Sequence, residues 1–183
     1  MSRSRFQPVI RRGGGPSLRA GALLIASCLV LGCSGGEAVT PEALARAKAT
    51  WGRAGLKDYD LEWTSSGIAT GHYSVVVRGG SVRKVQSVAP DGRLFELHPA
   101  EPRFYGVDGL FTTIADELAQ LKQPLPFGQP AGTKVVMRFT TDRELGYPRS
   151  YRRNVLGTPQ GLSIDVIRLV VSGASPGAGE ASR

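Results

Sequence analysis

Apolar side chains recur at helical spacing in two stretches of the chain. The first helix is predicted from the start signal Thr40-Pro41-Glu42, which offers a capping hydroxyl, a proline and an acid. It runs to about Gly55 and turns three residues to one side: Leu44, Ala47 and Trp51. The second is predicted from Asp108, as its cap, to Leu121, with an apolar stripe of Leu110, Phe111, Ile114, Leu118 and Leu121.

Alternation with a period of two predicts six strands, three after each helix. They cover residues 59–65, 71–78, 82–88, 134–141, 149–155 and 162–171. Leu94-Phe95-Glu96-Leu97 is a further short strand or a loop. Links of hairpin length, such as Gly79-Gly80, favour antiparallel pairing. The pattern predicts an α+β fold, with two helices on one face of an antiparallel, twisted sheet of about six strands in the order αβββ-αβββ.

An apolar run behind an arginine-rich start marks the beginning of the chain. Residues 20–31 are apolar or small throughout, and this run is too short to span a bilayer. It ends in Leu29-Val30-Leu31-Gly32-Cys33, which resembles the lipobox of bacterial lipoproteins. The resemblance implies cleavage before Cys33 and acyl chains on its sulfur and amine, which together give lasting membrane attachment. The alternative is an ordinary secretory signal in which Cys33 is a free thiol.

Removal of this leader changes the composition of the remaining protein. The predicted divisions are a signal peptide at 1–32, a spacer at 33–40, one α+β domain at 41–171 and a disordered tail at 172–183. All five leader arginines leave, so the net charge falls from +8 to +3 and the argument for nucleic-acid binding weakens. Because Cys28 leaves and Cys33 is lipidated, no cysteine remains for a disulfide, a metal site or a nucleophile.

Four segments carry a recognisable signature: Phe139 to Ser150, which contains Gly146-Tyr147-Pro148, and also Trp51, Asp58-Tyr59 and Leu110 to Ile114. Together they resemble a domain-of-unknown-function family of small bacterial lipoproteins. The similarity covers about residues 45–169 and implies a fold and a location but no activity. Many members carry a cysteine pair near the end of the first strand, where this chain has Thr64-Ser65-Ser66.

A run of arginines and tyrosines near the end of the domain is a candidate contact surface. Arginine beside tyrosine grips anions such as lipid head groups or acidic glycans. The candidate residues are Arg138, Arg149, Arg152, Arg153, Tyr147 and Tyr151. The competing interpretation is a solvated strand face on which arginines pair with Asp142, Glu144 and Asp165, while Tyr147 is a packing anchor.

Catalytic patterns are weak in this chain. His72 and His98 are the only histidines, and their separation does not suggest a metal site, so we expect no metal and no cofactor. Asp58, Asp60 and Glu62 alternate along one strand face, which a solvated face explains. The alternative is a hydrolase of unrecognised type that uses these carboxylates near His72.

The sequence therefore predicts a lipid-anchored protein of the bacterial cell envelope that is a binding or interaction module rather than an enzyme. Its partners are the membrane, through Cys33, and an envelope protein or an anionic polymer; no nucleic acid is expected. Ser34 after the cysteine is compatible with the periplasmic side of the outer membrane in a cell with two membranes.

Overall fold

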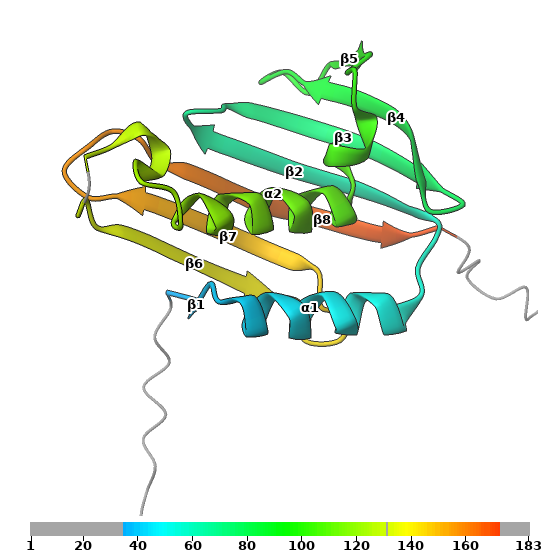
Figure 1. Cartoon of the computed structure of the whole chain (residues 1–183). Coiled ribbons are helices and arrows are strands. Elements are labelled where there is room, and N and C mark those ends of the chain that lie inside the picture. The colour runs from blue at the N-terminus through cyan, green and yellow to red at the C-terminus, as the bar shows by residue number, and fades with distance from the viewer. Residues whose placement is uncertain (1–34, 131, 173–183) are drawn as a thin grey trace, which may run out of the picture. The chain divides into compact units, whose positions relative to one another are not determined.

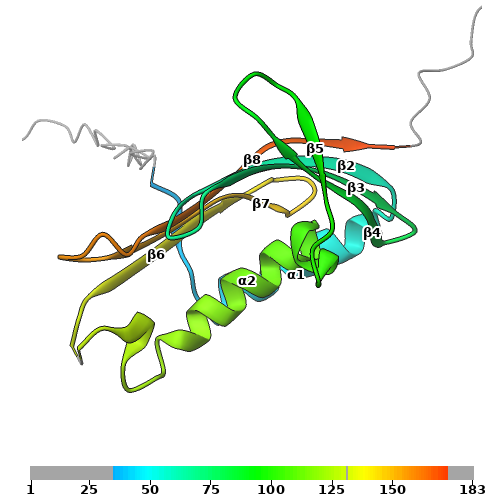
Figure 2. The same cartoon turned by 90° about the horizontal axis from the view of Figure 1, so that it is seen from above.

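Two α-helices cover one face of an antiparallel sheet in the computed structural model, which describes residues 35–130 and 132–172 (Figures 1 and 2). These residues belong to one compact unit. In this part of the chain the helices are α1 (Pro41–Ala54) and α2 (Val107–Gln120), with short 3₁₀ turns η1 (Pro102–Tyr105) and η2 (Pro126–Gly128). The strands are β1 (Glu37–Ala38), β2 (Tyr59–Gly67), β3 (Gly71–Arg78), β4 (Ser81–Val88), β5 (Leu94–Leu97), β6 (Val135–Thr141), β7 (Pro148–Val155) and β8 (Leu162–Val171).

The α+β class, the antiparallel sheet and the two helices are confirmed, but the number of strands was wrong. The described residues form eight strands, in the order β1-β6-β7-β8-β2-β3-β4-β5. The two additional strands are the edge strands β1 and β5, which are too short for a period of two to be recognised. The predicted leader and Cys33 lie outside the described residues, as does the tail from residue 173.

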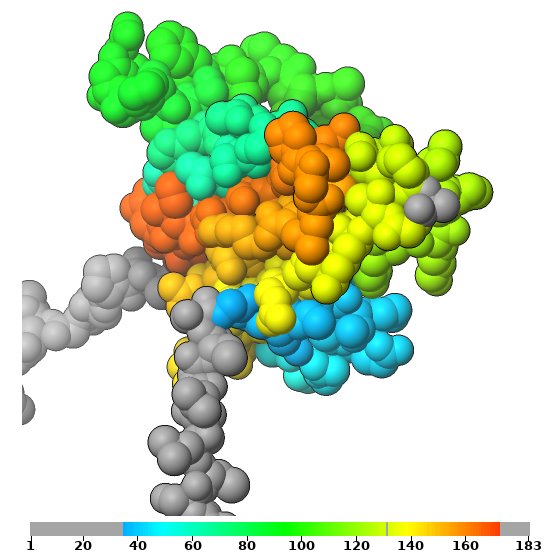
Figure 3. Space-filling view, turned by 90° about the vertical axis from the view of Figure 1, so that its left-hand side faces the viewer, coloured from blue at the N-terminus to red at the C-terminus, as the bar shows by residue number. Residues whose placement is uncertain are grey.

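Part of the predicted spacer belongs to the sheet. Glu37 and Ala38 pair with Phe139 and Arg138 of β6, and the next residue, Val39, is buried in the core. Figure 3 shows this N-terminal segment in blue beside the yellow β6. The folded domain therefore begins before Thr40, because backbone pairing at a sheet edge needs no apolar pattern.

Helix α1 follows its sequence signals closely. The Thr40 hydroxyl accepts a hydrogen bond from the Ala43 N–H at 3.1 Å, and Gly55 ends the helix with a left-handed φ of 63°. Leu44, Ala47 and Trp51 are buried as predicted. Local residues therefore specify both ends of this helix and its buried face.

The start of α2 differs from the prediction, because Asp108 is not its cap. The capping position is Gly106, and the Val107 N–H instead donates to the Tyr59 hydroxyl at 3.1 Å. Burial raises the pKa of Tyr59 to about 12, so the phenol stays neutral around pH 7. A side chain from β2 thus satisfies the helix end, and an acceptor 48 positions away in the sequence gives no local signal.

The Gly-Tyr-Pro turn is a packing element against α1. Gly146 has a φ of 79°, and a Cβ atom there would lie 2.6 Å from the Cβ of Thr50. Both the conformation and the close approach favour glycine. The Tyr147 ring packs edge-on to Trp51 with 6.5 Å between centroids, as expected for a packing anchor.

Candidate binding site

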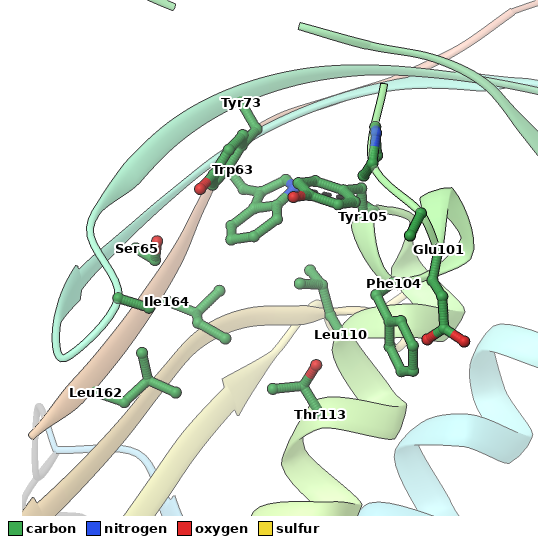
Figure 4. A pocket seen from close by; sticks show the side chains of 13 residues that line it. Trp63, Ser65, Tyr73, Glu101, Phe104, Tyr105, Leu110, Thr113, Leu162 and Ile164 are labelled. Atoms are coloured by element: carbon green, nitrogen blue, oxygen red, sulfur yellow. Dashed lines mark hydrogen bonds between the residues drawn. The ribbon is translucent and has the colours of Figure 1, made fainter. Parts of the chain in front are cut away.

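Three aromatic rings from different segments form a cluster between the sheet and η1 (Figure 4). Trp63 of β2 lies directly across from Tyr73 of β3, with ring centroids 4.6 Å apart. Tyr105 of η1 lies 5.2 Å from Tyr73 and 6.1 Å from Trp63, and its carbonyl accepts a hydrogen bond from Trp63 Nε1 at 3.1 Å. The indole hydrogen bond fixes η1 to the sheet and leaves the ring faces for apolar contact.

The position of η1 depends on a close contact with α2. A Cβ at Gly109 would lie 2.4 Å from the carbonyl oxygen of Arg103 and from the backbone of Phe104. Only a residue without a side chain allows the two segments to approach so closely. Gly109 therefore sets where Phe104 and Tyr105 stand relative to the helix.

A cavity of about 420 Å³ lies beside the aromatic cluster. Its sheet side consists of Trp63, Ser65, Tyr73, Leu162 and Ile164, and its helix and loop side of Leu110, Thr113, Glu101, Phe104 and Tyr105, as Figure 4 shows. Such a volume and an apolar, aromatic lining with a few hydroxyl groups are typical of small-molecule sites. Burial raises the pKa of Tyr105, so its phenol is a neutral hydrogen-bonding group.

A second, polar pocket of about 490 Å³ lies along the same helix. Its lining includes Glu117, Arg153, Phe127 and Gln160, and Thr113 lines both pockets. Arg153 is 2% exposed. These contacts make α2 the common wall of an apolar and a polar pocket.

Glu117 is held by two partners from β7. Arg153 Nη1 donates to its Oε1 at 2.7 Å, and the Tyr151 hydroxyl donates to its Oε2 at 2.9 Å. Burial nevertheless outweighs these two favourable partners and raises the pKa of Glu117. Both carboxylate oxygens are engaged, so Glu117 acts here as a positioning group for Arg153.

The predicted arginine and tyrosine surface is divided between the two faces of the sheet. Arg138 and Arg152 lie on the face away from the helices; Arg138 bonds to the Gly36 carbonyl and Arg152 pairs with Asp165 at 2.7 Å. Arg149 is exposed. Tyr151 and Arg153 are buried on the helix side. The six residues therefore do not form a single contact surface, because alternate residues of a strand face opposite sides.

Of the carboxylates suggested for catalysis, Asp60 and Glu62 lie on the outer face of the sheet, whereas Asp58 precedes β2. His72 Nε2 lies 2.9 Å from Glu62 Oε1, and Glu62 also pairs with Arg168. Asp60 pairs with Arg78, while Asp58 accepts a hydrogen bond from the Gly79 N–H at the β3–β4 turn. Glu62 and His72 thus meet, but neither lines the two pockets beside α2.

The described residues show neither a metal-binding cluster nor a membrane-spanning helix. Residues 35–130 and 132–172 hold no group of three or more histidine, cysteine or acidic side chains that could bind a metal ion. No helix within these ranges is long and apolar enough to cross a bilayer.

Sequence reasoning missed the residues that build the apolar cavity. Trp63, Tyr73, Phe104 and Tyr105 were not selected as candidate site residues, although Trp63 and Tyr73 lie within strands that were predicted. The Gly79-Gly80 turn fixes β3 against β4, but it gives no register between β2 and β3. Predicting the aromatic cluster would have required the β2–β3 register, which places Trp63 opposite Tyr73.

The sequence matches no protein-family model and no curated protein. The resemblance to a family of small bacterial lipoproteins accordingly stays a prediction.

Proposed function

We propose that this protein is a lipid-anchored binding module of the bacterial cell envelope that takes a small apolar ligand between its sheet and α2. The observation that carries the binding role is the cavity beside Trp63, Tyr73 and Tyr105. Burial of an apolar molecule there gains roughly 25 cal/mol for each Å² removed from water, and the aromatic faces add shape-specific contact. The motivation for the location is the arrangement of leader and cysteine around Cys33.

A ligand-binding test compares two neighbouring serines that face opposite sides of β2. Ser65 is buried and lines the cavity, whereas Ser66 is exposed and does not line it. The probe is N-phenyl-1-naphthylamine, an uncharged dye that fluoresces in apolar sites. The protein is the full chain carrying Cys33→Ala, so that no acyl chain or detergent competes with the dye.

We expect Ser65→Leu to weaken dye binding about tenfold, because the leucine side chain occupies part of the cavity, and Ser66→Leu to leave dye binding unchanged. Equal binding by the two variants, or no dye binding by the Cys33→Ala chain itself, contradicts the proposed site. Circular dichroism and the melting temperature confirm that both variants fold.

The location is tested separately by metabolic labelling with a tagged fatty acid. We expect label on the native chain and none on Cys33→Ala. A mature protein that begins elsewhere and carries no acyl group contradicts the anchor but leaves the cavity proposal intact.

A further inference from the structure

Arg153 has hydrogen-bonding capacity that the described residues do not use. One of its terminal nitrogens, Nη1, donates to Glu117. Its Nε and Nη2 are buried and have no hydrogen-bond partner within residues 35–130 and 132–172. Buried donors without a partner are rare in folded proteins, so these two groups mark a place where a ligand acceptor is favoured.

The two free donors form one edge of the guanidinium group. Nε–H and the neighbouring Nη2–H point in nearly parallel directions and match two acceptor oxygens, or one oxygen shared between them. Glu117 occupies the opposite end of the group through Nη1. Glu117 therefore orients Arg153, and the Nε–Nη2 edge of the guanidinium, here called the fork, stays unpaired within the described residues.

The charge of the polar pocket favours an uncharged head group over an anion. Glu117 already balances Arg153, and Asp116, an exposed carboxylate, also lines the pocket. A second anion at Arg153 would therefore enter a lining with an excess of negative charge. Carbonyl, ether or hydroxyl oxygens accept from the fork without adding charge, and hydroxyl groups can also donate to Asp116.

The two pockets adjoin one another along α2. Thr113 lines both, and the consecutive residues Ile68 and Ala69 at the β2–β3 turn line the polar and the apolar pocket respectively. Gln160 and Leu162 are divided in the same way. An elongated ligand can place an apolar chain beside Trp63 and a polar head beside Arg153.

We propose that the ligand is an uncharged amphiphile, whose apolar chain fills the aromatic cavity and whose oxygen-bearing head accepts hydrogen bonds from Nε and Nη2 of Arg153. This inference rests on the proposed function and specifies the class of its ligand. Acylglycerols and alkyl glycosides have the required chemistry.

Phe127 covers the head-group position. Its ring centroid lies 4.1 Å from the guanidinium carbon of Arg153, and its φ of 54° is uncommon for a residue with a side chain. Because Nε and Nη2 are buried and Phe127 stacks on the guanidinium, we infer that the turn Pro126–Gly128 shifts when a head group binds there. Phe127→Ala should therefore speed association of the amphiphile.

The test uses three probes with the same decyl-length chain and different heads: monodecanoylglycerol, decanoate and decyltrimethylammonium. Each displaces N-phenyl-1-naphthylamine from the Cys33→Ala full chain, at concentrations below micelle formation. We expect the neutral probe to act at concentrations about tenfold lower than either charged probe. The double variant Glu117→Gln/Arg153→Met removes the fork without leaving a buried unpaired charge, and should reduce this advantage to less than about twofold.

The other possible outcomes of the displacement experiment overturn different parts of the proposal. Equal displacement by all three probes, or tightest binding of decanoate, overturns the uncharged-head assignment while the apolar cavity stands. An unchanged preference in a folded double variant overturns the role of Arg153. Failure of the dye itself to bind overturns the proposed function as well. If the double variant does not fold, the ranking of the three probes on the Cys33→Ala chain still decides the head-group class.

Discussion

Arg152 and Arg153 are neighbours in the chain, yet the sheet gives them opposite environments. Each makes an ion pair of 2.7 Å, Arg152 with Asp165 and Arg153 with Glu117. The outer pair has side chains 43% and 44% exposed, whereas those of the inner pair are 2% and 15% exposed. Both pairs thus join an arginine to a carboxylate at the same distance, and they differ strongly in burial.

This difference determines how much each pair contributes. Water screens the outer pair, and exposed pairs of this kind are worth about 0–1 kcal/mol. Loss of one partner of a buried pair leaves an uncompensated charge in a poorly solvated place. Loss of a partner should therefore cost more on the helix side of the sheet, which is also the side of the proposed ligand site.

The largest expected effect comes from breaking the inner pair alone. Arg153→Met leaves Glu117 without its charged partner and should lower the free energy of unfolding by about 3–5 kcal/mol. The matched variant Arg152→Met on the outer face should lower it by less than about 1 kcal/mol. Urea denaturation midpoints measure both, and similar losses would show that burial does not distinguish the two faces.

An intermediate effect is expected at high pH. Tyr59 in the folded protein has a pKa of about 12 against about 10 when unfolded, so the folded state keeps this proton longer. The resulting stability is present below pH 10 and is lost as the pH rises from 10 to 12, by up to about 2–3 kcal/mol. Thermal melts across this interval should show the decline.

Tyr59→Phe is the variant that tests this assignment. It removes the acceptor of the Val107 N–H and should cost about 1–3 kcal/mol at neutral pH. It should also reduce the loss of stability at high pH, although part of that loss remains because the pKa of Tyr151 is raised as well. If Tyr59→Phe loses as much stability at high pH as the native chain does, the pH dependence belongs to other groups.

The smallest effect is expected on the outer face. His72→Ala removes the contact with Glu62, but Glu62 keeps Arg168 as a partner and the pair is partly exposed. The free energy of unfolding should fall by less than about 1 kcal/mol, and dye binding should not change. A hydrolytic activity of the chain that His72→Ala abolishes would instead support the alternative of a strand-carboxylate enzyme.

Local patterns predicted a large part of the fold. The six longer strands and both helices were placed within a few residues, because alternation and helical spacing depend only on neighbouring positions. Predictions failed where the partner was distant. Tyr59 at the start of α2, and the backbone pairing of Glu37–Ala38 with β6, both join segments far apart in the sequence.

The candidate site was less predictable than the fold. Arg153 and Tyr151 were selected as candidate contacts, but as part of an exposed basic surface. Arg152 and Arg153 were predicted on one surface, whereas neighbouring residues of a strand face opposite sides of the sheet. Glu117 lies on α2, and only the packing of that helix on β7 brings it to Arg153.

Helical spacing, strand alternation and capping signals were sufficient to predict the helices, the main strands and the α+β class, because these signals act through adjacent residues. The meeting of Trp63, Tyr73 and Tyr105 around a cavity, and the burial of one of two neighbouring arginines with unused donors, follow from the packing of distant segments. Pockets and burial arise from contacts between segments far apart along the chain, and no local pattern encodes the distance between them.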